Sequence, residues 1–550
     1  MSNHRNHWLA LALGLAAAAP ALLPTIAHAQ ATPTLPPSAD PALQEQDRLR
    51  REKLLHEREQ AAPKPAARAS EAAAAADGPA FVLQRVRFSN SRHLNREQLS
   101  AAAQPFLGRE VHLQDLQGLL QRVNELYRNQ GIYTAAATLP EQQVKDGTVV
   151  IQLVEGTLGQ VVVQKNEYLG APYVQRWIGD PKPGADVDAR RLEADVARFN
   201  RVNDAKLQAA LRAGQDFGKT DLVLEVQEPA RTSGQVFIDN YGYKSSGKTE
   251  LGGLVRRQKL FTDGDRSLAY LSAAEGTQAL SLSYNAPVDA SGWRLGASAS
   301  MNRTKMIAGD FKDIDVKGSG SSLAVDSSYL AVSSDTLWLN LTAGVQLSDS
   351  SNDVRGVAVS HYEITRLNLG APLSMTGNGW SWSFNPTLAF AHAGNKLLPE
   401  QSTSVTLFTG DSSAVVRIGD KGWYGLAQAS WQFTGHKSLP GALAFSVGGP
   451  ASVRGYEPGQ ISGDAGVLAT LEMHYDGWSP ANTHLDMFAF ADTSQVKSIN
   501  PTVHPTAAGF GANWSGWQGL GISLTAGRGL RGVVPEQRGW HAYARVSWAF

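Results

Sequence analysis

The sequence predicts two small α+β modules followed by an all-β transmembrane barrel of sixteen antiparallel strands. Three observations lead to this fold class. Residues 231–550 consist of short runs in which polar and apolar residues alternate, the same order of strands and helices occurs twice between residues 79 and 230, and the chain starts with a secretory signal. No amphipathic helix of usable length follows Pro229.

The composition of the 550-residue chain argues against several classes of function. Lysine plus arginine and aspartate plus glutamate number 50 each, so the charge favours neither nucleic acid nor another polyanion as a partner. The absence of cysteine excludes thiolate metal sites, iron–sulfur clusters, thiol nucleophiles and disulfides. The thirteen histidines form no H-E-x-x-H motif, and no G-x-S-x-G motif occurs, so we expect no enzyme, no cofactor and no metal site.

Residues 1–29 have the pattern of a signal peptide. Arg5 precedes the apolar stretch WLALALGLAAAAPALL, and Ala27-His28-Ala29 fits the cleavage rule, so the mature chain is expected to begin at Gln30. A retained membrane anchor is the alternative, but the stretch contains prolines and ends in this cleavage site. No later run reaches the roughly 18 apolar residues that a membrane helix needs.

The N-terminal region 30–59 contains a predicted helix at residues 41–59. Charges of opposite sign recur there at helical spacing and apolar residues are few, so the helix is polar on all sides. Such a segment is either a flexible tail in solvent or a helix in a water-filled space. Residues 60–78 are rich in alanine and proline and predict a linker, which can extend to about 65 Å and could tether a helix in a barrel lumen to modules outside it.

Two modules with the order β-α-α-β-β follow, at residues 79–155 and 156–230, and indicate an internal duplication. The long helix of the first module is expected to bury one apolar face, made of Leu113, Leu116, Leu120, Val123 and Tyr127. The corresponding face in the second module is made of Ala189, Leu192, Val196 and Phe199. The two modules end in similar strands, VIQLVEG and LVLEVQEP.

Sixteen strand-like runs follow, the eleventh being ALAFSVGG at residues 442–449. In the last run, Val546, Trp548 and Phe550 face one side while Tyr543 and Arg545 face the other. A soluble β-sandwich array would turn the apolar side to its core, whereas an outer-membrane barrel turns it to lipid. The even number of runs, the secretory signal and the aromatic C-terminus favour the barrel.

The stretch PASVRGYEPG at residues 450–459 predicts a loop with an unusual tip. Glycine and proline flank it, and Arg454 lies between Val453 and the pair Gly455-Tyr456. Arg454 is either an exposed loop cation or a buried one that needs an anion. Gly455 is expected to supply backbone freedom for a tight tip, and Tyr456 can both pack and form a hydrogen bond.

This organisation resembles the two-partner secretion transporters of the TpsB type, whose haemolysin secretion and activation members include ShlB, FhaC and HecB. The strongest match is FSVGGPASVRGYEPGQISGDAGVLATLEMHYD at residues 445–476, and a second motif, Phe-x-Asp, matches Phe490-Ala491-Asp492. The resemblance implies two periplasmic POTRA domains and an outer-membrane barrel into which the VRGY loop folds back. It also implies that Phe490 and Asp492 point inward, so that Asp492 is the candidate anion for Arg454.

The resemblance also implies the function and the partners. The POTRA domains would recognise an unfolded, β-helical (TpsA-like) exoprotein, and the barrel would export it without nucleotide hydrolysis. Lipid, the barrel-assembly machinery and periplasmic chaperones are the other implied partners, with Trp548 and Phe550 as the C-terminal strand signal. Two alternatives stay open: a barrel-assembly insertase of the same superfamily, and a passive porin. The cargo could be an adhesin, a cytolysin, a contact-dependent toxin or a haem-acquisition protein.

One motif in the sequence is typical of a different function, nucleotide binding. GYKSSGKT at residues 242–249 fits the phosphate-loop pattern G-x-x-x-x-G-K-[ST]. That chemistry requires a helix after the loop, because the helix N-terminus meets the phosphate. The following residues, ELGGLVRRQKL, predict a strand, so we expect a hairpin turn here.

Overall fold

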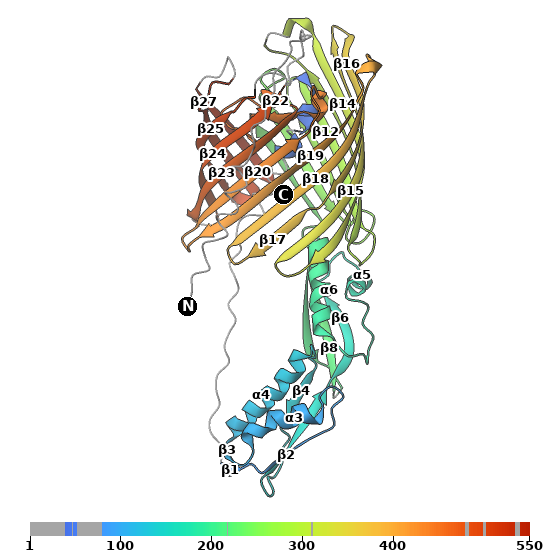
Figure 1. Ribbon diagram of the computed structural model, residues 1–550, viewed down its shortest axis with the longest axis vertical. Coiled ribbons are helices and arrows are strands. Elements are labelled where there is room, and N and C mark those ends of the chain that lie inside the picture. Colours follow the sequence, from blue (N-terminus) through green and yellow to red (C-terminus); the bar gives the residue numbers. More distant parts are fainter. Residues whose placement is uncertain are drawn as a thin grey trace. The chain divides into compact units, whose positions relative to one another are not determined.

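A computed structural model describes residues 39–46, 48–51, 80–216, 218–309, 312–478, 483–498, 502–533 and 539–550 (Figure 1). The predicted signal peptide, the linker 60–78 and residues 52–59 of the predicted N-terminal helix lie outside the described residues. Within the described ranges, no helix combines the length and the apolarity that a membrane span requires.

The first module is a three-stranded sheet covered by two helices. In the sheet, β5 lies in the middle, parallel to β2 and antiparallel to β4. The elements are β1 (Phe81–Val82), β2 (Arg85–Phe88), α3 (Arg96–Ala103), β3 (Glu110–Val111), α4 (Leu113–Asn129), β4 (Ala135–Thr138) and β5 (Thr148–Glu155). The buried face of α4 contains Leu116, Leu119, Val123 and Tyr127. Leu113 was expected there but is exposed, because α4 begins at this residue.

The second module repeats this topology. Its middle strand β8 is parallel to β6 and antiparallel to β7. The elements are β6 (Thr157–Gln164), α5 (Ala171–Trp177), α6 (Ala189–Val202), β7 (Lys206–Ala213) and β8 (Lys219–Gln227). Ala189 and Phe199 of α6 are buried as expected, while Leu192 and Val196 pack at the margin of the same core. The repeated strand arrangement agrees with the predicted duplication.

The remaining described strands, apart from β21 and β22, form a closed barrel. Its strands are β9 (Thr232–Asp239), β10 (Glu250–Gln258), β11 (Arg266–Ala273), β12 (Thr277–Pro287), β13 (Trp293–Lys305), β14 (Val316–Ser333), β15 (Leu337–Val354), β16 (Val357–Gly370), β17 (Leu373–Gly377), β18 (Trp380–Asn395), β19 (Thr403–Ile418), β20 (Trp423–Phe433), β23 (Ala465–Trp478), β24 (His484–Lys497), β25 (Thr506–Gly516), β26 (Leu520–Gly529) and β27 (Trp540–Ala549). Both β16 and β17 pair with β15 and β18, so they are two parts of one strand, interrupted at Pro372. The described barrel therefore has sixteen strands, as predicted.

The number sixteen was correct, but one of the runs behind it is not a barrel strand and one barrel strand was missed. The missed strand is β19, whose centre, Gly410 to Ser413, is polar on both faces and interrupts the alternation. The run ALAFSVGG is not a barrel strand. Its residues Phe445–Val447 form β21, which pairs with β22 (Ile461–Gly463) in a two-stranded sheet that is separate from the barrel wall. β20 pairs directly with β23, so the segment between them is not part of the barrel wall.

The alternation in β27 has the predicted direction. Val546 and Trp548 are exposed on the outside, whereas Tyr543 and Arg545 are buried. The phosphate-loop motif lies in the connection between β9 and β10, and β10 follows it in place of a helix. The hairpin interpretation therefore agrees with the structure.

Candidate functional site

The connection between β20 and β23, residues 434–464, folds into the barrel and is called the inner loop here. Its tip residues Val453, Arg454 and Tyr456 are 0%, 2% and 0% exposed. Tip residues share a cavity of about 820 Å³ with inward-facing side chains from strands on both sides of the barrel. The alternative that Arg454 is an exposed loop cation is excluded by this burial.

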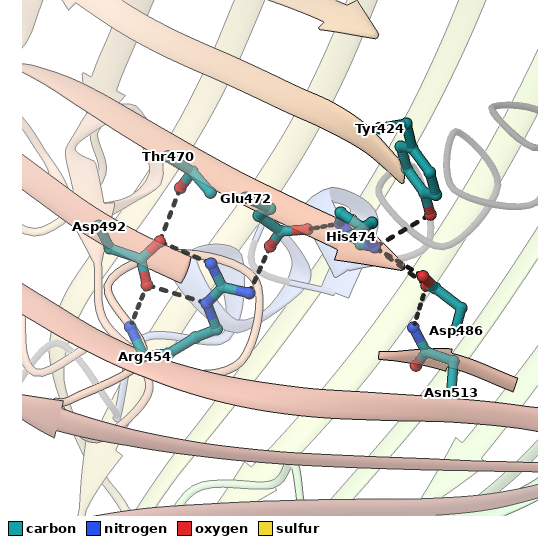
Figure 2. A network of polar contacts seen from close by, with 8 residues as sticks. All are labelled: Tyr424, Arg454, Thr470, Glu472, His474, Asp486, Asp492 and Asn513. Atoms are coloured by element: carbon teal, nitrogen blue, oxygen red, sulfur yellow. Dashed lines mark hydrogen bonds and ion pairs between the residues drawn. The ribbon is translucent and has the colours of Figure 1, made fainter. Parts of the chain in front are cut away.

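Arg454 forms a bidentate ion pair with Asp492 of β24 (Figure 2). Its Nε and Nη2 atoms donate to the two carboxylate oxygens at 2.9 and 2.7 Å, and its backbone N–H donates to Oδ2 at 3.0 Å. The guanidinium lies 3.4 Å from the ring centre of Phe490. A planar guanidinium can use a carboxylate and a ring face together, which a lysine ammonium cannot. Phe490 and Asp492 thus both point inward against Arg454.

A second carboxylate, which the sequence analysis did not identify, completes the guanidinium site. Arg454 Nη1 donates to Glu472 of β23, and the Thr470 hydroxyl of the same strand donates to Asp492 at 3.0 Å. Thr470 lies opposite Asp492 in the strand register, and Glu472 lies opposite Phe490. The sequence contains a signal for Glu472. In the run GVLATLEMHYD, Thr470 and Glu472 occupy alternate, polar positions, so both side chains must point to the inner face of the strand.

Gly455 and Tyr456 fasten the tip to the nearby strands β26 and β27 and to the connection between them. The Tyr456 hydroxyl donates to the Arg531 carbonyl at 2.7 Å, and the Tyr543 hydroxyl donates to the Tyr456 carbonyl at 2.9 Å. Gly455 was expected to provide backbone freedom, and this reason was wrong. It has no positive φ, but a Cβ at this position would overlap the backbone of Gly529 on β26. Glycine is needed for close approach.

Trp548 and Phe550 lie apart from this site, at the seam where the barrel closes. Their rings lie on the outside, half exposed, with centres 5.6 Å apart. The backbone N–H and carbonyl of Phe550 pair with those of Gly234 at 2.9 Å each. The last residue therefore extends the pairing between β27 and β9.

Helical residues 41–46 and 48–51, called the lumenal helix here, lie within the barrel and appear as the blue ribbon in Figure 1. On the wall side, Gln44 donates to Thr304 of β13 at 3.0 Å, and Arg51 pairs with Glu250 of β10 at 3.2 Å. On the other side, Arg50 donates to the Ser446 carbonyl of the inner loop at 2.7 Å. The all-round polarity of the helix is explained by polar neighbours on both sides.

Comparison with known proteins identifies the family. Residues 218–516 match the profile described as haemolysin secretion/activation protein ShlB/FhaC/HecB. The chain belongs to this family. Residues 81–156 also match the ShlB-type POTRA domain. The protein is therefore an outer-membrane translocator with POTRA modules in the periplasm, and members of this family are transporters rather than enzymes.

Two groups of curated relatives cover most of the chain. The heme/hemopexin transporter protein HuxB of Haemophilus influenzae strain 86-028NP is 24% identical over 401 residues, which are 70% of each chain. The outer membrane transporter CdiB of Dickeya dadantii is 24% identical over 421 residues, or 74% of each chain.

Solved structures share the fold. CdiB from Escherichia coli gives a TM-score of 0.65 at 20% identity, covering 92% of this chain and 99% of its own. BamA from Haemophilus ducreyi, lacking POTRA domains 1–3, gives 0.53 at 13% identity, covering 86% of this chain and all of its own.

The close packing at Gly455 generates a prediction. Gly455→Ala should displace the loop tip from β26, because the added Cβ has no space there. The matched control is Gly435→Ala in the same loop, where a Cβ would meet nothing within 4 Å. Limited proteolysis of the folded, detergent-purified protein should show faster cleavage within residues 434–464 for Gly455→Ala alone. Equal cleavage of the two variants would contradict the prediction.

Proposed function

We propose that this protein binds one unfolded partner exoprotein in the periplasm through its POTRA modules and exports it through the barrel without nucleotide hydrolysis. The observation that carries the proposal is a wide barrel whose lumen holds two segments of the chain itself, the lumenal helix and the inner loop. A barrel of about sixteen strands is wide enough for an aqueous channel. Family membership, with its relatives named as transporters, supports the same conclusion.

The lumenal helix would occupy the export path at rest and leave it during export. Its contacts to the wall and to the inner loop include hydrogen bonds, an ion pair and cation–ring contacts. Water can replace such contacts, so a polar helix exchanges the lumen for the periplasm at a small net free energy. Leu43 is the apolar side chain that the lumen buries most completely in this helix, at 2% exposure.

The POTRA modules would bind the cargo by strand addition to an open edge of their sheets. Each module has a three-stranded sheet with its middle strand, β5 or β8, paired on both sides, which leaves each outer strand with unpaired backbone groups along its free edge. An extended, unfolded segment can add to such an edge, and apolar side chains beside the helices can receive alternate residues of the segment. Folding of the β-helical cargo outside the cell would then make export directional.

The inner loop would be held by Arg454 and Asp492 in the position that export requires. The pair fixes the loop tip against β23 and β24, while Tyr456 fixes it against β26 and β27. Val453, Arg454, Gly455, Tyr456, Phe490 and Asp492 are the residues to which we assign this anchoring role.

A cross-linking experiment tests cargo capture directly. The chain has no native cysteine, so a single introduced cysteine is a unique probe. Gln208→Cys, exposed on the outer strand β7, should cross-link to the N-terminal part of the exoprotein when the full-length transporter is present in membranes. The control is Glu400→Cys, an exposed position between β18 and β19, at the end of the barrel opposite to the one where β9 begins. Equal cross-linking at both positions, or at neither, would reject capture by this edge.

A conductance experiment tests the lumenal helix. Deleting residues 30–60 should raise the single-channel conductance in planar bilayers, because the lumen loses its resident helix. Arg51→Ala removes the contacts to Glu250 and to the Tyr241 carbonyl and should make large openings more frequent. Arg355→Ala, in an exposed turn between β15 and β16, should leave the conductance unchanged. If the deletion has wild-type conductance, the helix does not close the lumen.

Secretion measurements test the anchoring pair. Removing one partner of a buried pair costs about 3–5 kcal/mol, a local loss that the closed ladder of barrel hydrogen bonds should survive. Arg454→Ala and Asp492→Ala should therefore assemble and keep heat-modifiable mobility, yet secrete little cargo. The double variant should lose less than the sum, because both changes break one interaction. Wild-type secretion by Arg454→Ala at normal barrel levels would show that the pair has no role in export.

A further inference from the structure

His474 extends the charged site beyond Arg454. It follows Glu472 by two residues on β23 and shares the inner face, and it is 1% exposed. Its Nε2 atom lies 2.8 Å from Glu472, and its Nδ1 atom lies 2.9 and 3.0 Å from the two oxygens of Asp486 on β24 (Figure 2). The Glu472 carboxylate thus lies between two potential cations, the guanidinium of Arg454 and the ring of His474.

The contacts determine how many protons the ring carries. A neutral imidazole has one N–H and one lone pair, so one of the two buried carboxylates would face a lone pair. Only the doubly protonated ring donates to both. The charges then alternate along the chain of contacts Asp492, Arg454, Glu472, His474 and Asp486, with two cations among three carboxylates. A neutral ring would leave one cation for three buried carboxylates, which is far less favourable.

We propose that His474 is held as an imidazolium in the resting barrel and is a positioning residue for the inner loop, because it orients Glu472 toward Arg454. The inference rests on the proposed function in one respect, namely that the position of the inner loop matters for export. The charge of His474 and its effect on the loop can be measured without cargo.

The surroundings of the ring favour one fixed orientation. It is stacked between Tyr424 of β20, at 4.4 Å between ring centres, and Phe488 of β24, at 5.0 Å. The titratable groups that face it are Glu472 on its own strand, Asp486 on β24 and the Tyr424 hydroxyl, 2.9 Å from Nδ1. Asn513 of β25 donates to Asp486 at 3.2 Å from the far side. The ring cannot turn away from Glu472 without losing both stacking partners.

A dependence on pH follows. The extra charge-assisted bonds are present while the ring keeps its second proton. When alkaline pH removes the proton that faces Glu472 to lumenal water, Glu472 loses the N–H that orients it toward Arg454. The more negative site attracts the guanidinium more strongly, but we expect the loss of orientation to outweigh this attraction, so the bond between Glu472 and Arg454 weakens as the pH rises. Loss of one charge-assisted bond corresponds to about a tenfold change in the population of the released loop tip.

Cysteine labelling measures this release. Val453→Cys, at a position 0% exposed next to Arg454, should react with a maleimide only when the loop tip leaves its site. Its rate is divided at each pH by that of Glu400→Cys, an exposed position, which removes the effect of pH on thiol reactivity. The measurement uses the full-length chain in detergent, and heat-modifiable mobility shows that each variant has a folded barrel.

At about pH 6, below the ordinary titration of histidine, the wild-type background should be protected and His474→Gln should label about tenfold faster. Raising the pH to about 9 should bring the wild-type ratio toward that of His474→Gln, whose own ratio should stay constant. His474→Lys should stay protected at both pH values, because lysine keeps its charge. The double variant His474→Gln/Asp486→Asn removes one cation and one carboxylate together without restoring the bond to Glu472, so it should label about as fast as His474→Gln.

Two results would overturn the proposal. If His474→Gln labels like the wild type, the ring does not position the loop. If it labels faster but the wild-type ratio is the same at both pH values, the ring only fills space and carries no titrating proton. Should His474→Lys fail to fold, the double variant and the wild-type pH profile decide the question. A loss of secretion with unchanged labelling would concern the proposed function and leave this inference untouched.

Discussion

A charged side chain inside a closed barrel needs its counter-charges fixed in place, and this constraint determines where the inner loop lies. Arg454 is 2% exposed, and its guanidinium has carboxylates from two neighbouring strands and a ring face from one of them. Burying a guanidinium without these partners would cost far more free energy than the loop contacts could offset. The position of the 31 residues between β20 and β23 inside the barrel therefore depends strongly on one side chain at their tip, supported by the contacts of Tyr456.

The stability of the barrel and the position of its contents depend on different interactions. Adjacent strands pair over as many as seventeen residues, and the ladder closes between β9 and β27, so no edge is left unpaired. The site around Arg454 consists of a few side chains on the inner surface of that ladder. A change there alters where the loop lies without opening the wall. This separation is what allows a transporter to rearrange its lumen while the membrane remains sealed.

Much of the architecture could be predicted from alternation and duplication, because both follow directly from backbone geometry. The same parity argument placed Asp492 on the inner face. It would also have placed Glu472 and His474 there, but their significance depends on which loop residue arrives opposite them, and that is a long-range contact. Local pattern failed where the environment was unusual: β19 is polar on both faces at its centre, and ALAFSVGG alternates because it packs inside the lumen. The sequence motif indicated that residue 455 must be glycine. It could not indicate the cause, which is the close approach of the Gly529 backbone, because that contact is long-range.

The two segments inside the barrel are held in different ways, which suggests different mobility. The lumenal helix has separated polar contacts to β10, β13 and the inner loop, each of which water can replace singly. The inner loop has a connected set of buried charges, in which the loss of one group leaves others unsatisfied. Cooperative contacts release together or not at all. We therefore expect the helix to be the segment that leaves when cargo enters, with the inner loop remaining as a fixed part of the lumen wall past which the cargo moves.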